Sequence, residues 1–218
     1  NKQWEQITLP HTPFVEPLTV LHQWQGICYY KKKITITPEE AKKHIWIEFE
    51  GAMHLADVWI NGKYVMQHAG GYTPFVVDAT GLLKTGKENE LLVRLDNRNN
   101  SLIPPGKPLE TLDFCYYGGI YRNVHLIAKA DVHITHPILD GHPAGAGIFI
   151  TYPKVSQELS VVDAKTEIKN TSDKEKVVEL RHTLYTWKKQ KGKDKKVQNI
   201  SETLTLHPGV TIENNQQI

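Results

Sequence analysis

Cysteine is scarce in this sequence, long apolar runs are absent and neither sign of charge dominates. Two cysteines, Cys28 and Cys115, are too few for a disulfide scaffold. No apolar stretch approaches ~18 residues, so no membrane span is expected. The 26 Lys and Arg against 24 Asp and Glu leave a formal net charge of +2, which argues against a dedicated nucleic-acid-binding domain.

Motifs for cofactor or metal chemistry are also lacking. The glycine pairs have neither the strand–loop–helix setting nor the lysine of a phosphate-binding loop, and no G-x-S-x-G nucleophile elbow occurs. His133 and His136 form the closest histidine pair, but an offset of three on a strand puts the two side chains on opposite faces. We therefore expect no cofactor and no metal site.

The sequence does contain a regular series of short, alternating segments. Apolar and polar residues alternate over residues 29–36, 44–50 and 91–96, which is typical of half-buried strands. Asn61-Gly62 lies between two such segments and predicts a tight hairpin. Thr37, with Glu40 three residues later, predicts one short helical turn closed by a capping box. No helical period persists, so the pattern indicates an all-β antiparallel sandwich or barrel.

The organisation of the chain changes near residue 130. Further short strands are predicted beyond it, and residues 161–170 alternate so that Val162, Ala164, Thr166 and Ile168 share one face. A stretch of ~90 residues with this rhythm suggests a small immunoglobulin-like sandwich. The sequence therefore predicts two domains, residues 1–129 and residues 130–218.

Aromatic residues cluster in two glycine-containing segments. Exposed rings can stack on the apolar faces of sugars, whereas buried rings serve packing, and the sequence leaves both roles open. The residues are Tyr72, Phe75, Phe114, Tyr116, Tyr117 and Tyr121.

These motifs resemble a known family. Residues 49–62, residues 70–75, residues 91–97 and residues 113–124 look like the N-terminal module of glycoside hydrolase family 2, and they occur in order over about 80 residues. The family's β-galactosidases and β-glucuronidases carry a Gly-Ile-(aromatic)-Arg-x-Val core in the last segment, which matches Gly119–Val124. The chain is thus similar to the sugar-binding and immunoglobulin-like region of a β-galactosidase-like enzyme.

The resemblance implies an architecture. It gives a jelly-roll (galactose-binding-like) β-sandwich over residues 1–129 and a partial immunoglobulin-like β-sandwich over residues 130–218, truncated at its C-terminus. In the family a catalytic (β/α)₈ barrel follows, and such a barrel needs ~250 residues of its own. We expect the chain to be a fragment of a larger retaining enzyme, with the barrel as its missing partner.

The resemblance also assigns residue roles. Retaining glycosidases need two carboxyl groups roughly 5–5.5 Å apart, and in this family both lie on the barrel. Asn89-Glu90 repeats the family's Asn-Glu dipeptide but lies at a turn, so no catalytic residue is assigned to this chain. Asp113, six residues before Gly119, matches the position from which the family places an Asp against the substrate, while Arg122 and Asn123 are expected to hold the loop. Met53 stands where some β-galactosidases carry Asn, which leaves the preferred sugar open.

Several functional interpretations are consistent with these features. The first is a non-catalytic part of a β-glycosidase that completes the barrel's active site and meets a β-galactoside or related glycan; the parent enzyme is alternatively a β-glucuronidase or β-mannosidase. The second is a free-standing carbohydrate-binding module. A third, an assembly surface for a homo-oligomer, is compatible with either. We expect a periplasmic or secreted location, with a leader removed.

Overall fold

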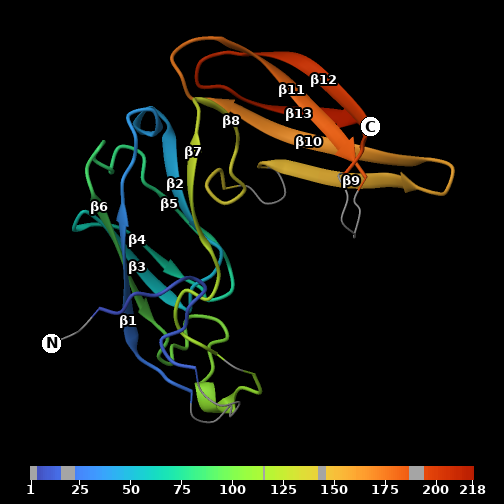
Figure 1. Cartoon of the computed structure of the whole chain (residues 1–218). Coiled ribbons are helices and arrows are strands. Elements are labelled where there is room, and N and C mark those ends of the chain that lie inside the picture. The colour runs from blue at the N-terminus through green and yellow to red at the C-terminus, as the bar shows by residue number, and fades with distance from the viewer. Residues whose placement is uncertain (1–3, 16–22, 115, 142–145, 187–193) are drawn as a thin grey trace. The chain divides into compact units, whose positions relative to one another are not determined.

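The computed structural model describes residues 4–15, 23–114, 116–141, 146–186 and 194–218. It divides the chain into two compact units, residues 1–128 and residues 129–218 (Figure 1). Almost all of the regular structure is strand, which confirms the predicted all-β fold. Within the described residues, no helix is both long and apolar enough to cross a membrane.

The first unit contains seven strands in two sheets. One sheet has the order β1-β6-β3-β4 and the other the order β5-β2-β7. The strands are β1 (Ile27–Ile34), β2 (His44–Phe49), β3 (Leu55–Ile60), β4 (Lys63–Ala69), β5 (Phe75–Asp78), β6 (Asn89–Asp96) and β7 (Val124–Lys129). Two short 3₁₀ turns, Glu40–Lys42 and Leu109–Thr111, complete the unit.

The two sheets of the first unit share one apolar core. Val58 and Leu95 of the first sheet and Val77 of the second are fully buried, and Phe49 stacks on Phe75 with ring centroids 4.5 Å apart. The alternation read from β6 is confirmed, because its apolar residues at odd positions are buried and those between are not. The unit is therefore a sandwich held by burial of its strands' inner faces.

Local signals in the sequence form as expected. Asn61 and Gly62 have φ of 52° and 77°, and they join β3 to β4 with Ile60 paired to Lys63. Both turn residues adopt the left-handed conformation that a two-residue hairpin requires. The Thr37 backbone N–H donates to Glu40 Oε2 at 2.7 Å, and the Glu40 N–H donates back to Thr37 Oγ1 at 3.2 Å. The predicted hairpin and capping box are both confirmed.

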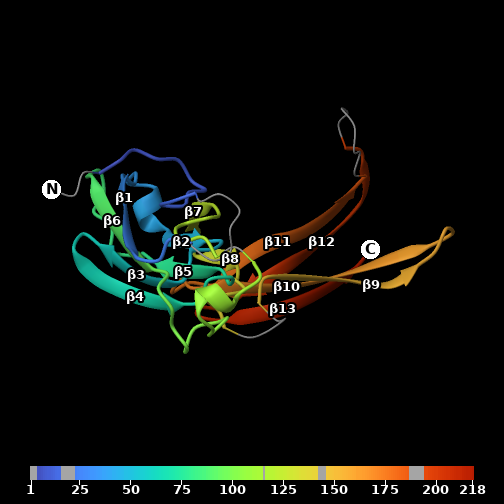
Figure 2. The same cartoon turned by 90° about the horizontal axis from the view of Figure 1, so that it is seen from below.

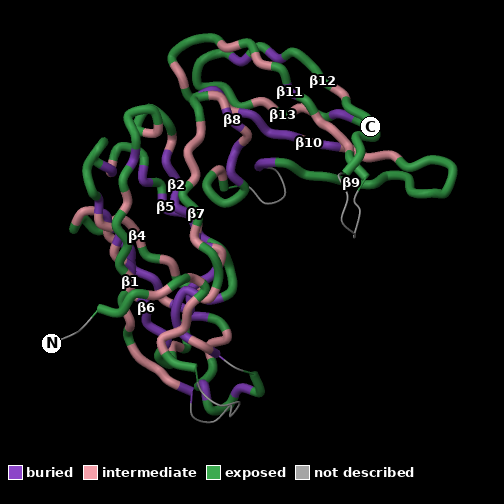
Figure 3. Tube along the Cα trace, in the orientation of Figure 1, coloured by how far each residue is buried: buried purple, intermediate pink, exposed green. Residues whose placement is uncertain are grey.

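The second unit is built from longer ribbons. It contains β8 (Val132–Ile134), β9 (Ile148–Val155), β10 (Ser160–Asn170), β11 (Lys176–Tyr185), β12 (Lys196–Leu206) and β13 (Thr211–Gln217). One sheet has the order β13-β10-β8, with β9 also paired to β10, and β11 pairs with β12 in a separate ribbon (Figure 2). The core is small and is formed by Ile168, Leu180, Leu204 and Leu206. Figure 3 shows β9 exposed along its whole length while the neighbouring β10 carries buried positions.

Candidate functional site

The loop over residues 109–123, which contains most of the last family motif, is anchored at both ends. Leu109, Leu112 and Tyr116 pack with Met53 in a small core of their own. The backbone N–H of Tyr116 donates to Gln23 Oε1. These contacts hold the loop against the first unit although it contains no strand.

Gly119 fixes the C-terminal end of this loop. Its φ is +103°, and a Cβ at this position would lie 2.5 Å from the Tyr30 hydroxyl oxygen and 2.7 Å from the carbonyl oxygen of His11. Its own carbonyl accepts a hydrogen bond from the Met53 N–H at 2.9 Å. Only glycine combines this conformation with so close an approach. Ile120 comes next in the chain and is buried in the main core.

Tyr121, Arg122 and Asn123 lock the same end of the loop. The Tyr121 hydroxyl donates to the carbonyl of Gly71, and the Arg122 guanidinium lies 5.9 Å from the centroid of the Tyr121 ring. The backbone N–H of Asn123 donates to Glu50 Oε2 at 3.2 Å. Each of these groups is engaged with the protein itself.

Asp113 lies at the exposed part of the loop. Its carboxylate makes no hydrogen bond or ion pair to any residue that the structure describes, and the neighbouring Phe114 is 43% exposed. Cys115 lies outside the described residues. An anchored loop thus presents one carboxylate and one aromatic ring to the outside.

The aromatic cluster divides between the two roles considered for it. Phe75 and Tyr116 are buried and serve packing, whereas Tyr72 and Phe114 are exposed. Tyr72 meets Tyr116 edge to face, with centroids 6.2 Å apart. The exposed Tyr72 ring therefore packs on the buried Tyr116 ring of the loop.

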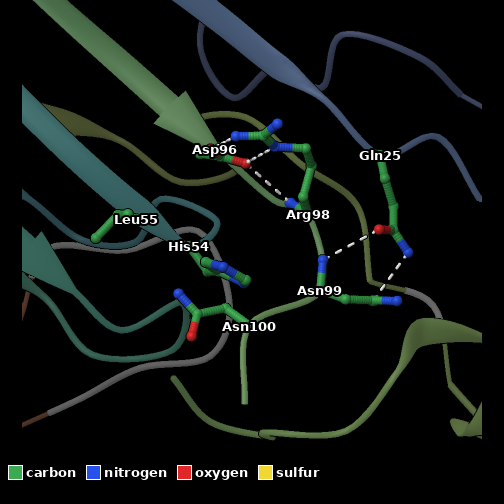
Figure 4. Close-up of a pocket in the computed structure, with 7 residues that line it drawn as sticks. All are labelled: Gln25, His54, Leu55, Asp96, Arg98, Asn99 and Asn100. Carbon is green, nitrogen blue, oxygen red and sulfur yellow. Dashed lines mark hydrogen bonds and ion pairs between the residues drawn. The ribbon is translucent and has the colours of Figure 1, made fainter. Parts of the chain in front are cut away.

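An open pocket of about 500 Å³ lies where β3 begins and β6 ends. We call it the His54 pocket, after the buried histidine that lines it (Figure 4). The remaining lining residues are Gln25, Leu55, Asp96, Arg98, Asn99 and Asn100. Asp113 is not among them.

A charged network forms one wall of the His54 pocket. Asp96 accepts hydrogen bonds from Arg98 Nε at 2.9 Å and Nη2 at 2.7 Å, and a further one from Arg94 Nη2 at 3.1 Å. Arg94 also donates to Asp57 Oδ2 at 2.9 Å. The hydrogen bonds from Arg98 lower the pKa of Asp96, which favours its ionised form. Figure 4 shows the Arg98 guanidinium turned towards Asp96.

His54 lines the pocket and is only 3% exposed. Its Nδ1 is hydrogen-bonded to the Tyr116 hydroxyl. Burial lowers the pKa of His54 because a charged imidazolium is costly to desolvate. Burial therefore favours the neutral ring, and the contact with Tyr116 connects the pocket to the anchored loop.

The sequence does not predict this pocket. His54 and the segment 91–97 enter only as parts of the family resemblance, and Gln25, Arg98 and Asn99 belong to no motif considered above. The one signal present is the Asp96-x-Arg98 spacing directly after a strand. Gln25 and Asn99, 74 residues apart in the sequence, are joined by two hydrogen bonds of 3.0 and 3.1 Å.

The Asn89-Glu90 dipeptide is bonded within the protein. Asn89 is fully buried, and its side chain bonds the backbone of Ile34, Lys84 and Lys87 as well as Asn61. Glu90 pairs with Lys31 at 2.7 Å. Asn89 thus stabilises the turn over residues 84–87 that precedes β6.

The histidine pair also bonds locally. His133 Nδ1 bonds the carbonyl of Ala130 at 2.7 Å, and His136 Nδ1 accepts the Ile138 N–H at 3.1 Å. Across the described ranges, no group of three or more His, Cys, Asp and Glu side chains is arranged to hold a metal ion. These contacts give the two histidines no common ligand.

Comparisons with known proteins identify the first unit. The family model described as glycosyl hydrolases family 2, sugar binding domain, matches residues 8–130. A β-glucuronidase of Bacteroides fragilis is 33% identical over 171 residues, and a β-galactosidase of Thermoanaerobacter pseudethanolicus is 34% identical over 176 residues. These alignments cover 76% and 78% of this chain but only 23% of each relative.

Solved structures extend the similarity over both units. The structure of Bacteroides uniformis β-glucuronidase 2 matches 99% of this chain with a TM-score of 0.79 and 30% identity. The match occupies 24% of that protein. The chain thus spans about a quarter of the length of these relatives.

Proposed function

The chain belongs to glycoside hydrolase family 2, and from this premise we propose that it acts as a non-catalytic N-terminal region that completes the substrate site of a β-glycosidase. The observation that carries the proposal is Asp113, an exposed carboxylate on an anchored loop with no partner among the described residues. A carboxylate without a partner among the described residues has its hydrogen-bonding capacity available for an external ligand.

The chemistry of Asp113 suits a sugar. An ionised carboxylate accepts two hydrogen bonds, and such bonds to a charged acceptor are stronger than those between neutral groups. Phe114 beside it offers an exposed ring for the apolar face of a pyranose. The pair therefore provides both kinds of contact that a carbohydrate needs.

The non-catalytic part of the proposal rests on the carboxyl groups. A glycosidase general acid requires a raised pKa so that it carries a proton near neutral pH. In the described portion of the chain, every carboxyl group whose pKa is clearly shifted has it lowered. For Asp96 the causes are hydrogen bonds and charges from arginines, which stabilise the anion. We therefore assign the two catalytic carboxyl groups to a (β/α)₈ barrel outside this chain.

The substrate class of the proposal is a β-linked galactoside or glucuronide. Relatives named for each of these sugars match this chain with nearly equal identity. Met53 is buried beneath the loop, so an Asn contact from that position is not available to choose between them. The proposal keeps both sugars until they are compared by experiment.

The experiment is a pair of measurements on the purified 218-residue chain. Incubation with 4-nitrophenyl β-galactoside and β-glucuronide should release no nitrophenol, and release by the chain would overturn the non-catalytic assignment. Calorimetric titration with galactosides, glucuronides and mannosides should give no binding tighter than about 1 mM, which corresponds to roughly 4 kcal/mol.

The calorimetry also tests the second candidate function, a free-standing carbohydrate-binding module, which is favoured only by the exposed Tyr72 and Phe114 rings. Binding of one sugar below about 1 mM that is lost in Asp113→Ala would establish a self-sufficient module and overturn the composite site. The Asn199→Asp variant, changed on an exposed position of β12, is the control for unspecific effects of substitution.

A further inference from the structure

β9 is an edge strand with one unpaired side. It pairs with β10, and no other strand among the described residues pairs with it (Figure 2). All of its residues are exposed, among them Ile148 at 53%, Phe149 at 43% and Ile150 at 40%. An edge strand presents a row of unpaired N–H and C=O groups to which a further strand can bind. β9 lies in the second unit and Asp113 in the first, so an inference from β9 goes beyond the proposed function.

The pairing with β10 determines which backbone groups point towards the free edge. The Glu167 N–H donates to the carbonyl of Gly147 at 2.9 Å. Ile148, the next residue, therefore belongs to a non-hydrogen-bonded pair with β10. Because these directions alternate along an antiparallel strand, Phe149 points its N–H and carbonyl towards β10, whereas Ile148 and Ile150 point theirs outward. The outward groups have no partner within the described ranges.

The first half of β9 lacks the features that usually block an edge. Natural edge strands are protected by lysine, proline or a bulge. β1, at the edge of a sheet in the first unit, carries lysine at positions 31–33. In β9 the corresponding features come late, as Pro153, Lys154 and a shift of the register with β10 beyond Thr151. Residues 148–151 contain none of them, so this part of the edge is open to pairing.

The open part of the edge is complementary to itself. Residues 148–150 are Ile-Phe-Ile, the same in both chain directions. A second copy placed antiparallel about a two-fold axis at Phe149 brings Ile148 opposite Ile150 of the second copy. The outward backbone groups of these isoleucines then bond one another, and the two Phe149 rings face each other in a non-hydrogen-bonded pair, where side chains lie closest. Each copy would use the same surface, as a two-fold interface requires.

The charges near the edge are compatible with this pairing. Lys154 is the charged residue of β9 and lies outside residues 148–150. Lys165 faces Phe149 from β10 and is bound to Glu213 at 2.5 Å. Lys165 and its counterpart would be separated by three strand spacings, about 14 Å, which exceeds the screening length of about 8–10 Å at physiological salt. A second copy therefore brings an uncharged strand to an uncharged edge.

We propose that two copies of the chain associate by antiparallel pairing of β9 with β9, centred on Phe149. The sheet of β13, β10 and β9 in one copy then continues into the sheet of the other. The backbone hydrogen bonds set the register, and the isoleucine and phenylalanine side chains bury apolar surface on both faces of the joint. Because few residues take part, a weak and reversible dimer is expected.

The first test is analytical ultracentrifugation of the 218-residue chain over a range of concentrations. The average mass should rise with concentration from that of one chain towards that of two. A chain that stays monomeric up to about 100 μM would overturn the proposal.

Charged variants at the centre of the joint test the register. In one chain, Phe149→Glu places a carboxylate opposite Lys165, so the fold should be kept. In the dimer it places two carboxylates opposite each other, so the dissociation constant should rise roughly tenfold or more. Phe149→Lys should weaken self-association in the same way. An equimolar mixture of the two variants should form dimers again, because opposite charges then face each other.

The control substitution lies on the same strand. Val155 is 72% exposed and follows Pro153, outside the proposed joint, so Val155→Glu should leave the dissociation constant within about twofold. An equal loss of dimers in Val155→Glu and Phe149→Glu would overturn the assignment to residues 148–150. Undiminished dimers of Phe149→Glu would overturn the edge itself, and a mixture of the two Phe149 variants that stays monomeric would overturn the two-fold axis at Phe149.

Discussion

The two units use similar backbone pairing but bury very different amounts of apolar surface. In the first unit Phe49, Val58 and Leu95 are at most 1% exposed, and both sheets contribute to one core. Among the described residues of the second unit, the buried core cluster has four members, and every position of β9 is exposed. Strand pairing is therefore not a measure of how firmly a sandwich is closed.

Both units contain a buried asparagine that pins a turn. Asn89 bonds the backbone around the start of β6, and Asn170 donates to the carbonyls of Lys174 and Leu206 at the end of β10. Both side chains are fully buried. A buried asparagine at a turn is thus common to both units, whereas the large apolar core is found in the first. Exposed apolar strands such as β9 are typical of surfaces that contact another protein or domain.

The largest effect is expected from a substitution in the core of the first unit. Phe49→Ala should lower the free energy of unfolding of the first unit by about 3–5 kcal/mol, because it empties a buried ring site and removes the stack on Phe75. Urea titration followed by tryptophan fluorescence measures this, since four of the five tryptophans, Trp4, Trp24, Trp46 and Trp59, lie in the first unit.

A truncation at an exposed position of the second unit provides the contrast. Val177 on β11 is 64% exposed, so Val177→Ala should change the free energy of unfolding by no more than about 0.5 kcal/mol. A comparable loss in both variants would contradict the view that burial distinguishes the units.

A smaller difference in stability is expected between substitutions that remove an ion pair from each unit. Arg94, with a side chain 22% exposed, bonds both Asp57 and Asp96, so Arg94→Ala should cost about 2 kcal/mol by leaving two partly buried carboxylates without their shared partner. Arg181 bonds Glu179 at 2.8 Å on the open surface of β11, and Arg181→Ala should leave stability unchanged. Chemical denaturation of both variants at two salt concentrations checks this. A salt-sensitive loss in Arg181→Ala alone would reverse the assignment.

The smallest effect is a pH dependence of the first unit that arises from His54. Burial lowers the pKa of His54 below 6.5 in the folded state, so unfolding lets the ring take up a proton as pH falls below about 6.5. Stability of the first unit should therefore decrease over that range. His54→Gln should remove this part of the dependence, which denaturation curves on either side of about pH 6.5 will show. Asp96 acts at lower pH, because its lowered pKa preserves its contribution until it is protonated.

Much of the fold could be predicted because its signals are local. Asn61-Gly62 requires a backbone conformation that few residue pairs adopt, and Thr37 with Glu40 closes its own hydrogen bonds over three residues. The alternation in β6 predicts which face of the strand is buried. Each of these is read from neighbours along the chain, so no tertiary information was needed.

The candidate site could be predicted only in part. Asp113 was reached through a resemblance, and the structure adds that its carboxylate is exposed on an anchored loop. The His54 pocket was missed, because Gln25, His54 and Asn99 carry no pattern that marks them as neighbours. The role of Asn89 was likewise invisible, since its partners lie up to 55 residues away.

Local sequence is enough to specify the strands, the tight turns, the all-β class and the family, because each depends on backbone preference or on motifs in order. Which polar groups are left unpaired depends instead on the folded chain. The Nδ2 of Asn100 is left free of described partners because its oxygen accepts the backbone N–H of Leu102, and Tyr116, the partner of His54, is 62 residues away in the sequence. Free hydrogen-bonding capacity is a property of tertiary structure, and the chemistry of a ligand is matched to it.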